Sequence, residues 1–192
     1  KVIFLEREPV APSGDDIPNQ PPETGNPIAT PGSHPFADGQ TGTVTFPFAA
    51  DSRVIGKNSI RSARAVVVDL SAGEVVASRL ADEKMYPASM TKVMTLLTAA
   101  ELADDLDTPF TMTQEILDPL YREGATLTGV AAGESLTLRE YCYAAALRSA
   151  GDATGAVAES LCGSERAFVE RMNEKARQLG LSEKTHFANT SG

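Results

Sequence analysis

The segment YPASMTKVMTLLTAAEL, residues 86–102, decides how the fold is interpreted. Its many apolar residues predict a helix that packs in a protein core, and Pro87 suits the first turn of such a helix. Ser89 and Lys92 stand three positions apart. A helix therefore places them on the same face, with the serine hydroxyl and the lysine amine within hydrogen-bond reach.

This pair has a catalytic and a structural interpretation. A serine becomes a good nucleophile when a neighbouring base takes its proton, and a lysine can be that base because burial lowers its pKa. Backbone N–H groups at the helix start can also stabilise an oxyanion. In the structural interpretation, Ser89 caps a core helix and Lys92 extends its amine to water. Ser-x-x-Lys alone does not decide, because ordinary composition gives about one chance match in a chain this long.

Composition excludes several classes of function. The 192 residues, 42% of them hydrophobic, suffice for one domain with a core. The net charge of −9 argues against nucleic acid and anionic membrane surfaces as partners. Cys142 and Cys162 fall in helical patterns and are interpreted as buried thiols. His34 and His186 have no partners at metal-ligand spacing, so no metal site is predicted.

The first part of the chain, residues 1–52, is interpreted as a Pro/Gly-rich linker or tail, because nine of the twelve prolines precede residue 50. Within it, Val44, Phe46 and Phe48 alternate as in a half-buried strand, and Pro47 would confine that strand to a sheet edge. Two hypotheses remain open: a spacer, or a tail that docks on its own domain through residues 44–50 while residues 11–40 make few contacts.

Residues 53–192 form the predicted domain. ARAVVVDL (63–70) and EVVAS (74–78) are predicted strands joined by a turn, whereas residues 109–117 and 121–134 are predicted to be irregular. A two-stranded hairpin makes a poor sheet alone. The domain is therefore either mostly helical, or its remaining strands lie beyond Gly192.

Three further helices are expected after the segment 86–102. A capping box of Thr137 and Glu140 opens the first, a break at Gly151–Asp152 precedes the second, and Ser164 caps the third. The third helix presents three apolar residues on one face and ends at a glycine: Phe168, Met172, Ala176 and Gly180.

PASMTKVMTLLTAAEL (87–102), the strand pair before it and LREYCYAAALRSAGDATGAVAESLC (138–162) resemble the serine D-alanyl-D-alanine carboxypeptidases, the low-molecular-weight penicillin-binding proteins. The resemblance covers about residues 60–192. It implies the α/β penicillin-binding/β-lactamase-like transpeptidase fold, represented here by two N-terminal strands and the helical part. Residues 53–192 would then be the N-terminal portion of the catalytic domain.

The resemblance also implies roles for individual residues. Ser89 matches the acylated nucleophile, Lys92 its base, and Ser149 the serine that relays a proton to the leaving group. Gly151 stands at a substrate-binding position where the family usually has asparagine, so the turn is kept but the amide is lost. The chain has no Lys-Thr-Gly, and KTH (184–186) follows a helix rather than lying on a strand. We therefore expect the chain to end within the domain and to be nearly inactive alone.

The implied function is that of a serine-type D-Ala-D-Ala carboxypeptidase that acts on peptidoglycan stem peptides through a Ser89 acyl-enzyme and binds β-lactam antibiotics. No cofactor is needed. The location would be extracytoplasmic, with residues 1–52 as an extracytoplasmic linker or tail and a membrane anchor outside this chain. The open sheet edge would pair with another chain or with the Phe-rich tail. The alternatives are a serine β-lactamase and a non-catalytic interaction module that keeps the fold.

Overall fold

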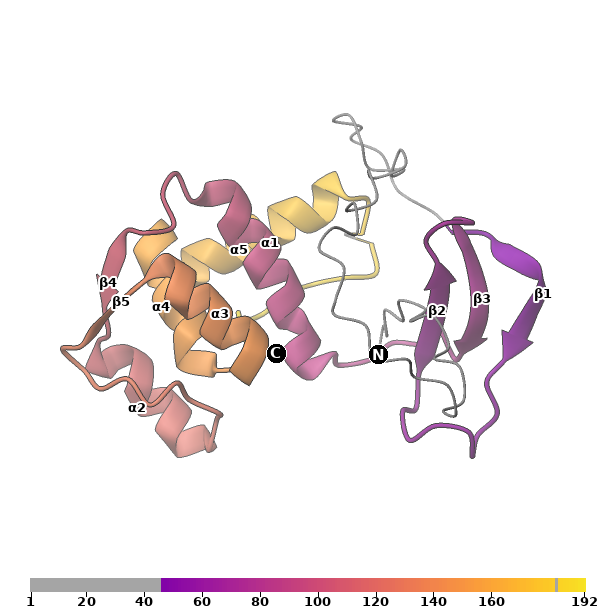
Figure 1. Ribbon diagram of the computed structural model, residues 1–192, viewed down its shortest axis with the longest axis horizontal. Coiled ribbons are helices and arrows are strands. Elements are labelled where there is room, and N and C mark those ends of the chain that lie inside the picture. Colours follow the sequence, from indigo (N-terminus) through magenta and orange to yellow (C-terminus); the bar gives the residue numbers. More distant parts are fainter. Residues whose placement is uncertain (1–45, 182) are drawn as a thin grey trace, which may run out of the picture. The chain divides into compact units, whose positions relative to one another are not determined.

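Figure 1 shows the computed structural model of the protein, which describes residues 46–181 and 183–192. The expectations for residues 11–40 and for Val44 lie outside these residues. The described chain divides into two compact units, a strand unit up to Ala81 and a helical unit, Asp82–Gly192. Within the described residues, no helix combines the length and apolar character needed to cross a membrane.

The strand unit is a three-stranded sheet of β1 (Phe48–Val54), β2 (Ala65–Asp69) and β3 (Glu74–Arg79), in the order β1-β3-β2. β2 and β3 pair antiparallel, which confirms the predicted hairpin. The Asp69 carboxylate shapes the turn by accepting hydrogen bonds from the N–H groups of Ser71 at 2.9 Å and Ala72 at 3.0 Å. Gly73, with φ +69°, completes the turn in a conformation that favours glycine.

β1 is a third strand that the sequence analysis placed slightly too early. It pairs in parallel with β3 at the edge of the sheet, and its edge position agrees with the prediction. Pro47 precedes it and accepts a hydrogen bond from the Val75 N–H at 2.8 Å through its carbonyl oxygen. The strand runs across the predicted boundary between residues 52 and 53.

The two phenylalanines near β1 do not both pack as predicted. Phe46 is half-buried, but Phe48 is 57% exposed, and Ala49 points into the unit instead. The register of the β1–β3 pair shifts within the strand. The alternation of the large side chains predicted that Phe48 points inward, and this prediction was wrong.

The helical unit holds one 3₁₀ helix, two short strands and five α-helices among the described residues: η1 (Ala88–Met90), α1 (Thr91–Leu102), β4 (Pro109–Thr111), α2 (Gln114–Glu123), β5 (Ser135–Thr137), α3 (Leu138–Arg148), α4 (Gly151–Cys162) and α5 (Glu165–Gln178). β4 and β5 pair antiparallel.

Local signals placed two helix starts correctly. The Thr137 hydroxyl accepts from the Glu140 N–H while the Glu140 carboxylate accepts from the Thr137 N–H, so the predicted capping box is present. Ser164 caps α5 by accepting from the Ala167 N–H at 3.2 Å. Gly180 follows α5 with φ +71°, as expected for a residue that ends a helix.

Two predictions for this unit were wrong. The stretches 109–117 and 121–134, predicted to be irregular, contain β4 and most of α2. Thr113 caps α2 and Gly124 ends it, but Pro119 inside the helix disguises its pattern. The break after α3 lies at residues 149–150, because Gly151 is already the first residue of α4.

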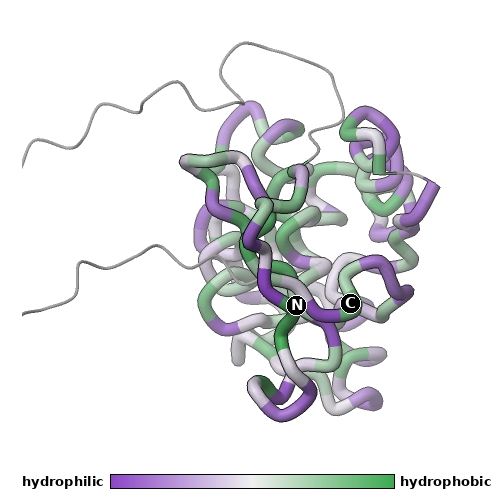
Figure 2. Tube along the Cα trace, turned by 90° about the vertical axis from the view of Figure 1, so that its right-hand side faces the viewer, coloured by the Kyte–Doolittle hydropathy of each residue, from purple (hydrophilic) through white to green (hydrophobic). Residues whose placement is uncertain are grey.

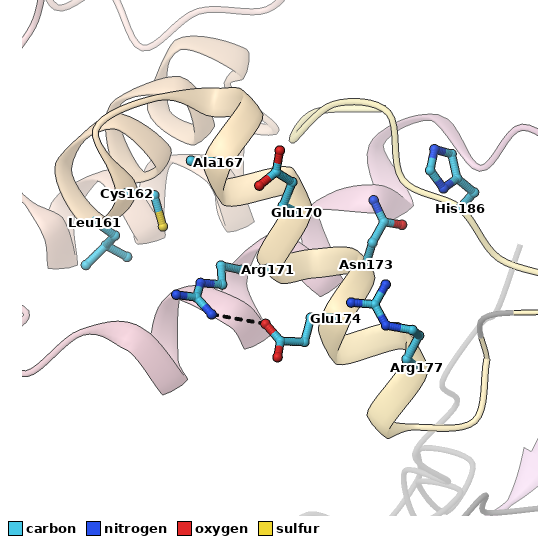
Figure 3. A pocket seen from close by; sticks show the side chains of 9 residues that line it. All are labelled: Leu161, Cys162, Ala167, Glu170, Arg171, Asn173, Glu174, Arg177 and His186. Atoms are coloured by element: carbon cyan, nitrogen blue, oxygen red, sulfur yellow. Dashed lines mark hydrogen bonds and ion pairs between the residues drawn. The ribbon is translucent and has the colours of Figure 1, made fainter.

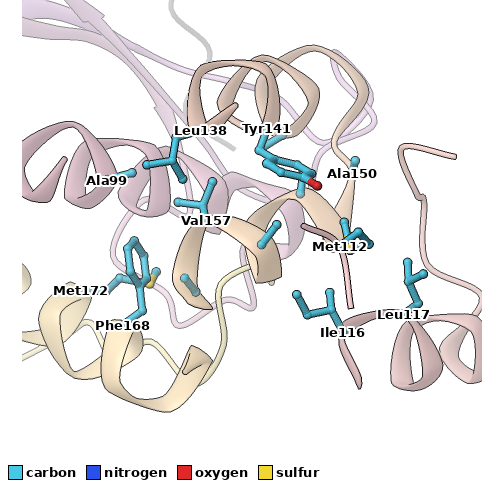
Figure 4. Packing of buried hydrophobic residues seen from close by; sticks show 14 of the residues in the cluster. Ala99, Met112, Ile116, Leu117, Leu138, Tyr141, Ala150, Val157, Phe168 and Met172 are labelled. Atoms are coloured by element: carbon cyan, nitrogen blue, oxygen red, sulfur yellow. The ribbon is translucent and has the colours of Figure 1, made fainter. Parts of the chain in front are cut away.

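The core of the helical unit is one cluster of buried apolar side chains drawn from α1 to α5 (Figure 4). Phe168 and Met172 of α5 lie beside Val157 of α4 in this cluster, and all three are fully buried. Hydrophobic and hydrophilic residues alternate along the chain trace (Figure 2), as expected for helices with one buried face. The predicted apolar face of α5 is thus confirmed.

Candidate active site

Ser89 and Lys92 meet at the junction of η1 and α1. The Lys92 Nζ donates a hydrogen bond to the Ser89 Oγ at 3.3 Å. Ser89 is exposed, whereas Lys92 is only 6% exposed. A ligand can therefore reach the hydroxyl from solvent while the amine beside it is shielded from water.

Burial lowers the pKa of the Lys92 amine from its ordinary value of 10.5, because desolvation disfavours the charged form. The amine also donates a hydrogen bond to the carbonyl oxygen of Ser191 at 2.9 Å. In the neutral amine, a hydrogen bond to this carbonyl leaves the nitrogen lone pair free to accept the Ser89 proton. This is the protonation state that a general base requires.

The backbone just before Ser89 is strained and closely packed. Ala88 has φ +49°, a conformation uncommon for a residue with a side chain. Gly192, with φ +94°, passes so close that a Cβ on it would lie 1.9 Å from the Ala88 carbonyl oxygen. Only glycine fits this approach.

The segment that carries Ser191 was missed as part of the site. Thr190 is buried, and its carbonyl oxygen accepts a hydrogen bond from the Thr95 hydroxyl at 2.7 Å. One pattern in the sequence could have indicated such a partner segment: a row of threonines on an otherwise apolar helix. Thr91, Thr95 and Thr98 are all buried along α1. Polar residues on a buried helix face need partners, and here the terminal segment supplies one.

Ser149 lies at the C-terminal end of α3 in a left-handed conformation, with φ +59°. Its side chain is half-buried. Across residues 46–181 and 183–192, no hydrogen bond joins its hydroxyl to Ser89 or Lys92. Its proton-relay role therefore stays a prediction.

Gly151 is buried at the start of α4, with both of its backbone polar groups in use. Its N–H donates to the Thr126 carbonyl oxygen at 2.8 Å, and its own carbonyl accepts from the Thr154 hydroxyl at 2.8 Å. A Cβ added to it would face Leu120 at 3.4 Å and Ala125 at 3.8 Å. A substrate-binding role for Gly151 also stays a prediction.

Asp152, next to Gly151 in the first turn of α4, is a buried carboxylate that was predicted only as part of a break. It accepts from the Thr128 N–H at 2.9 Å, from the Thr128 hydroxyl and from the Ala153 N–H at 3.0 Å. These bonds tie the loop after α2 to the first turn of α4. The position at a helix N-terminus also favours the negative charge.

Comparison with known proteins decides the family. The sequence profile of the family described as D-alanyl-D-alanine carboxypeptidase matches residues 51–192. The chain belongs to this family. It is 33% identical over 153 residues to the D-alanyl-D-alanine carboxypeptidase DacF of Bacillus subtilis, covering 78% of this chain and 39% of DacF. It is 30% identical over 145 residues to DacC of Escherichia coli, covering 72% and 36%. The chain thus spans less than two fifths of the length of these two curated relatives.

Solved structures give the same result for the fold. The D-alanyl-D-alanine carboxypeptidase DacD from Francisella tularensis matches with a TM-score of 0.62 and 28% identity, over 80% of this chain and 35% of that one. A DD-transpeptidase of Streptomyces matches with a TM-score of 0.65 and 25% identity, over 72% and 55%. The predicted fold class, a mixed α/β penicillin-binding fold of which this chain covers part, is confirmed.

A groove of about 830 Å³ lies along α4 and α5 of the helical unit (Figure 3). Its wall includes Cys162 and His186, and Arg171 pairs with Glu174 in it at 3.0 Å. The groove contains neither Ser89 nor Lys92. In the part of the chain that the structure describes, no three His, Cys, Asp or Glu side chains are grouped to hold a metal ion.

Proposed function

We propose that this chain carries the nucleophile and base of a serine D-alanyl-D-alanine carboxypeptidase that acts on peptidoglycan stem peptides. One observation carries the proposal: a buried Lys92 amine lies 3.3 Å from the exposed hydroxyl of Ser89. Membership of the D-alanyl-D-alanine carboxypeptidase family supports it.

In the proposed acylation step, the Ser89 Oγ attacks the carbonyl carbon of the penultimate D-alanine. The neutral Lys92 amine takes the hydroxyl proton as the new C–O bond forms. The tetrahedral intermediate then loses terminal D-alanine as the C–N bond breaks, and a proton passes to the leaving nitrogen. Ser149 is proposed to relay that proton.

In the second step, water hydrolyses the ester on Ser89. The Lys92 amine again accepts a proton, now from the attacking water, and the serine hydroxyl is regenerated. A β-lactam would acylate Ser89 in the same way, but with opening of its ring. No step needs a metal or an organic cofactor.

A fluorescent penicillin tests the proposal directly. We expect covalent label on Ser89, located by mass spectrometry, and no label on Ser89→Ala. Ser71→Ala, which changes an exposed serine in the strand unit, is the matched control and should label like the wild type. An adduct on another residue would contradict the assignment.

The backbone N–H and carbonyl of Gly151 are both hydrogen-bonded within the protein. This favours one competing function, a non-catalytic interaction module of the same fold. A module predicts no covalent label in this experiment. A serine β-lactamase, the other enzyme considered, predicts label that is lost quickly by hydrolysis. The decay of the label after excess penicillin is removed therefore separates the two enzymes.

The proposed substrate also implies a place and partners. Peptidoglycan lies outside the cytoplasmic membrane, so we propose an extracytoplasmic location. The outer strands of the sheet, β1 and β2, are its two edges. Another polypeptide is proposed to pair with one of them, and sedimentation of the purified chain across a concentration series would detect self-association of this kind.

A further inference from the structure

We propose that Thr190 and Glu165 are positioning residues that hold the Ser191 carbonyl against the Lys92 amine. The inference rests on the proposed function, because it assigns these residues a part in preparing Lys92 as the base. It concerns a network that joins the first half of α1, the start of α5 and the segment 189–192.

The acceptor of this Lys92 hydrogen bond is the Ser191 carbonyl oxygen. The Ser191 carbonyl is a backbone group, so its position is fixed only by the conformation of the segment that carries it. Asn189 shapes that segment locally, because its side-chain oxygen accepts from the N–H groups of Ser191, at 3.2 Å, and of Gly192. These bonds lie within the segment and do not fix it to the helices.

Thr190 supplies the attachment. Its side chain is 1% exposed, and every polar group of the residue is engaged. Its N–H donates to the Glu165 carboxylate at 3.0 Å and its hydroxyl to the same oxygen at 2.8 Å. Its carbonyl accepts from Thr95 at 2.7 Å, one turn beyond Lys92 on α1. Thr190 thus fixes the residue next to Ser191 to α1 and α5 at once.

The network also reaches Gly151 at the start of α4. The hydroxyls of Thr190 and Thr154 lie 3.0 Å apart, and the Thr154 hydroxyl donates to the Gly151 carbonyl at 2.8 Å. Glu165 is the first residue of α5, directly after the Ser164 cap, where a carboxylate is favoured by the helix dipole. Its position is therefore fixed by the backbone of α5 although its side chain lies at the surface.

A carbonyl held in this way affects the chemistry of Lys92 rather than only the stability of the fold. It shields the amine from water and directs one N–H away from Ser89. Burial is the cause that lowers the pKa of Lys92, and among the described residues no carboxylate pairs with the amine to raise it. If the segment is released, water reaches the Nζ, the pKa of Lys92 rises towards 10.5, and less neutral amine is present at pH 7.

The test uses two matched pairs of variants of the whole chain. Thr190→Val removes the hydroxyl at nearly constant volume, and Thr190→Ser restores it. Glu165→Ala removes the acceptor, and Glu165→Gln keeps an oxygen that can accept. Glu170→Ala is the control on the same helix, because Glu170 is exposed and pairs only weakly, with Arg166 at 4.0 Å.

Two measurements are made on each variant. The pKa of Lys92 is obtained by NMR titration of its side-chain ¹³Cε signal, assigned with Lys92→Met. The rate of acylation by fluorescent penicillin is measured at pH 7. We expect Thr190→Val and Glu165→Ala to raise the pKa by about one unit, which reduces the neutral fraction and the acylation rate roughly tenfold. Thr190→Ser, Glu165→Gln and Glu170→Ala should stay within about twofold of the wild type.

The outcomes separate this inference from the proposed function. Unchanged Lys92 pKa values in folded Thr190→Val and Glu165→Ala would overturn the inference, whatever the labelling shows. A wild-type chain that never labels would overturn the proposed function, while a raised pKa in the variants would still support the positioning role. If circular dichroism shows that Thr190→Val does not fold, the Lys92 pKa in the surface variant Glu165→Ala decides whether the inference holds.

Discussion

The helical unit and the strand unit are held together in different ways. Fifteen buried apolar residues form one cluster in the helical unit. The described strand unit buries three, Ala49, Ala65 and Val75, and leaves Phe48 and Val54 largely exposed. Only the helical unit has the packed interior that can hold side chains in fixed positions. Ser89 and Lys92 lie on that unit, so changes there should affect both stability and chemistry, whereas equivalent changes in the sheet should affect little.

The largest contrast is expected between two phenylalanines. Phe168→Ala empties a fully buried site and should lower the free energy of unfolding by about 3–5 kcal/mol. Phe48→Ala removes an exposed ring and should cost less than about 1 kcal/mol. Chemical denaturation of both variants measures the difference. Similar losses would mean that the sheet depends on packing that its burial does not reveal.

Two glycines with positive φ make the second comparison. Gly192→Ala places a methyl group on the Ala88 carbonyl next to Ser89, so the segment 189–192 must move. A misplacement of about 1 Å near a reacting group can cost about 100-fold in rate, which penicillin labelling would measure. Gly73→Ala meets no neighbouring atom and should cost only about 1 kcal/mol of stability, with labelling unchanged. Full labelling of a folded Gly192→Ala would show that the segment is not needed.

A third comparison sets two turn-forming aspartates against each other. Asp152→Ala leaves the partly buried Thr128 N–H without its acceptor and should cost about 1–3 kcal/mol. Asp69→Ala affects an exposed hairpin, where water can replace the carboxylate, and should cost about 0.5 kcal/mol. Thermal unfolding of both variants, with Asp152→Asn as a shape-matched control, measures the two costs. Equal costs would argue that the loop after α2 gains nothing from Asp152.

The smallest effect concerns the pH dependence of stability. Because burial lowers the pKa of Lys92 in the folded state, the unfolded chain binds more protons between that lowered value and 10.5. The free energy of unfolding should therefore rise with pH across this window and stay level below it, as far as Lys92 contributes. Lys92→Met should remove that rise. Denaturant titrations from pH 7 to pH 10.5 test it, with the exposed change Val93→Met as control, and a rise that persists in Lys92→Met would contradict the assignment.

Local chemistry explains which parts of the fold could be predicted from the sequence. The capping box of Thr137 and Glu140 and the Ser164 cap each depend on residues three positions apart, so the pattern is visible without the fold. The same holds for the apolar face of α5. The Ser89 and Lys92 contact was predictable for this reason too, because one helical turn separates them.

The parts that could not be predicted depend on distant contacts or on conflicting signals. Pro119 predicts a break within α2, whereas Thr113 and Gly124 predict a helix between them, and the helix forms. The parallel pairing of β1 with β3 joins segments with another strand between them. The Ser191 carbonyl that meets Lys92 has no local pattern at all, and sequence analysis alone cannot place a backbone group from the far end of a domain.

The distance along the chain between Lys92 and Ser191 has a consequence for biosynthesis. The two residues are separated by 99 positions. At the usual speed of translation, about 5–20 residues per second, roughly 5–20 s pass between their synthesis. During that interval a nascent chain already contains Ser89 and Lys92, but not the carbonyl that accepts from the Lys92 amine. On the proposed function, the site would be assembled only when the end of the helical unit has been made and has folded onto α1.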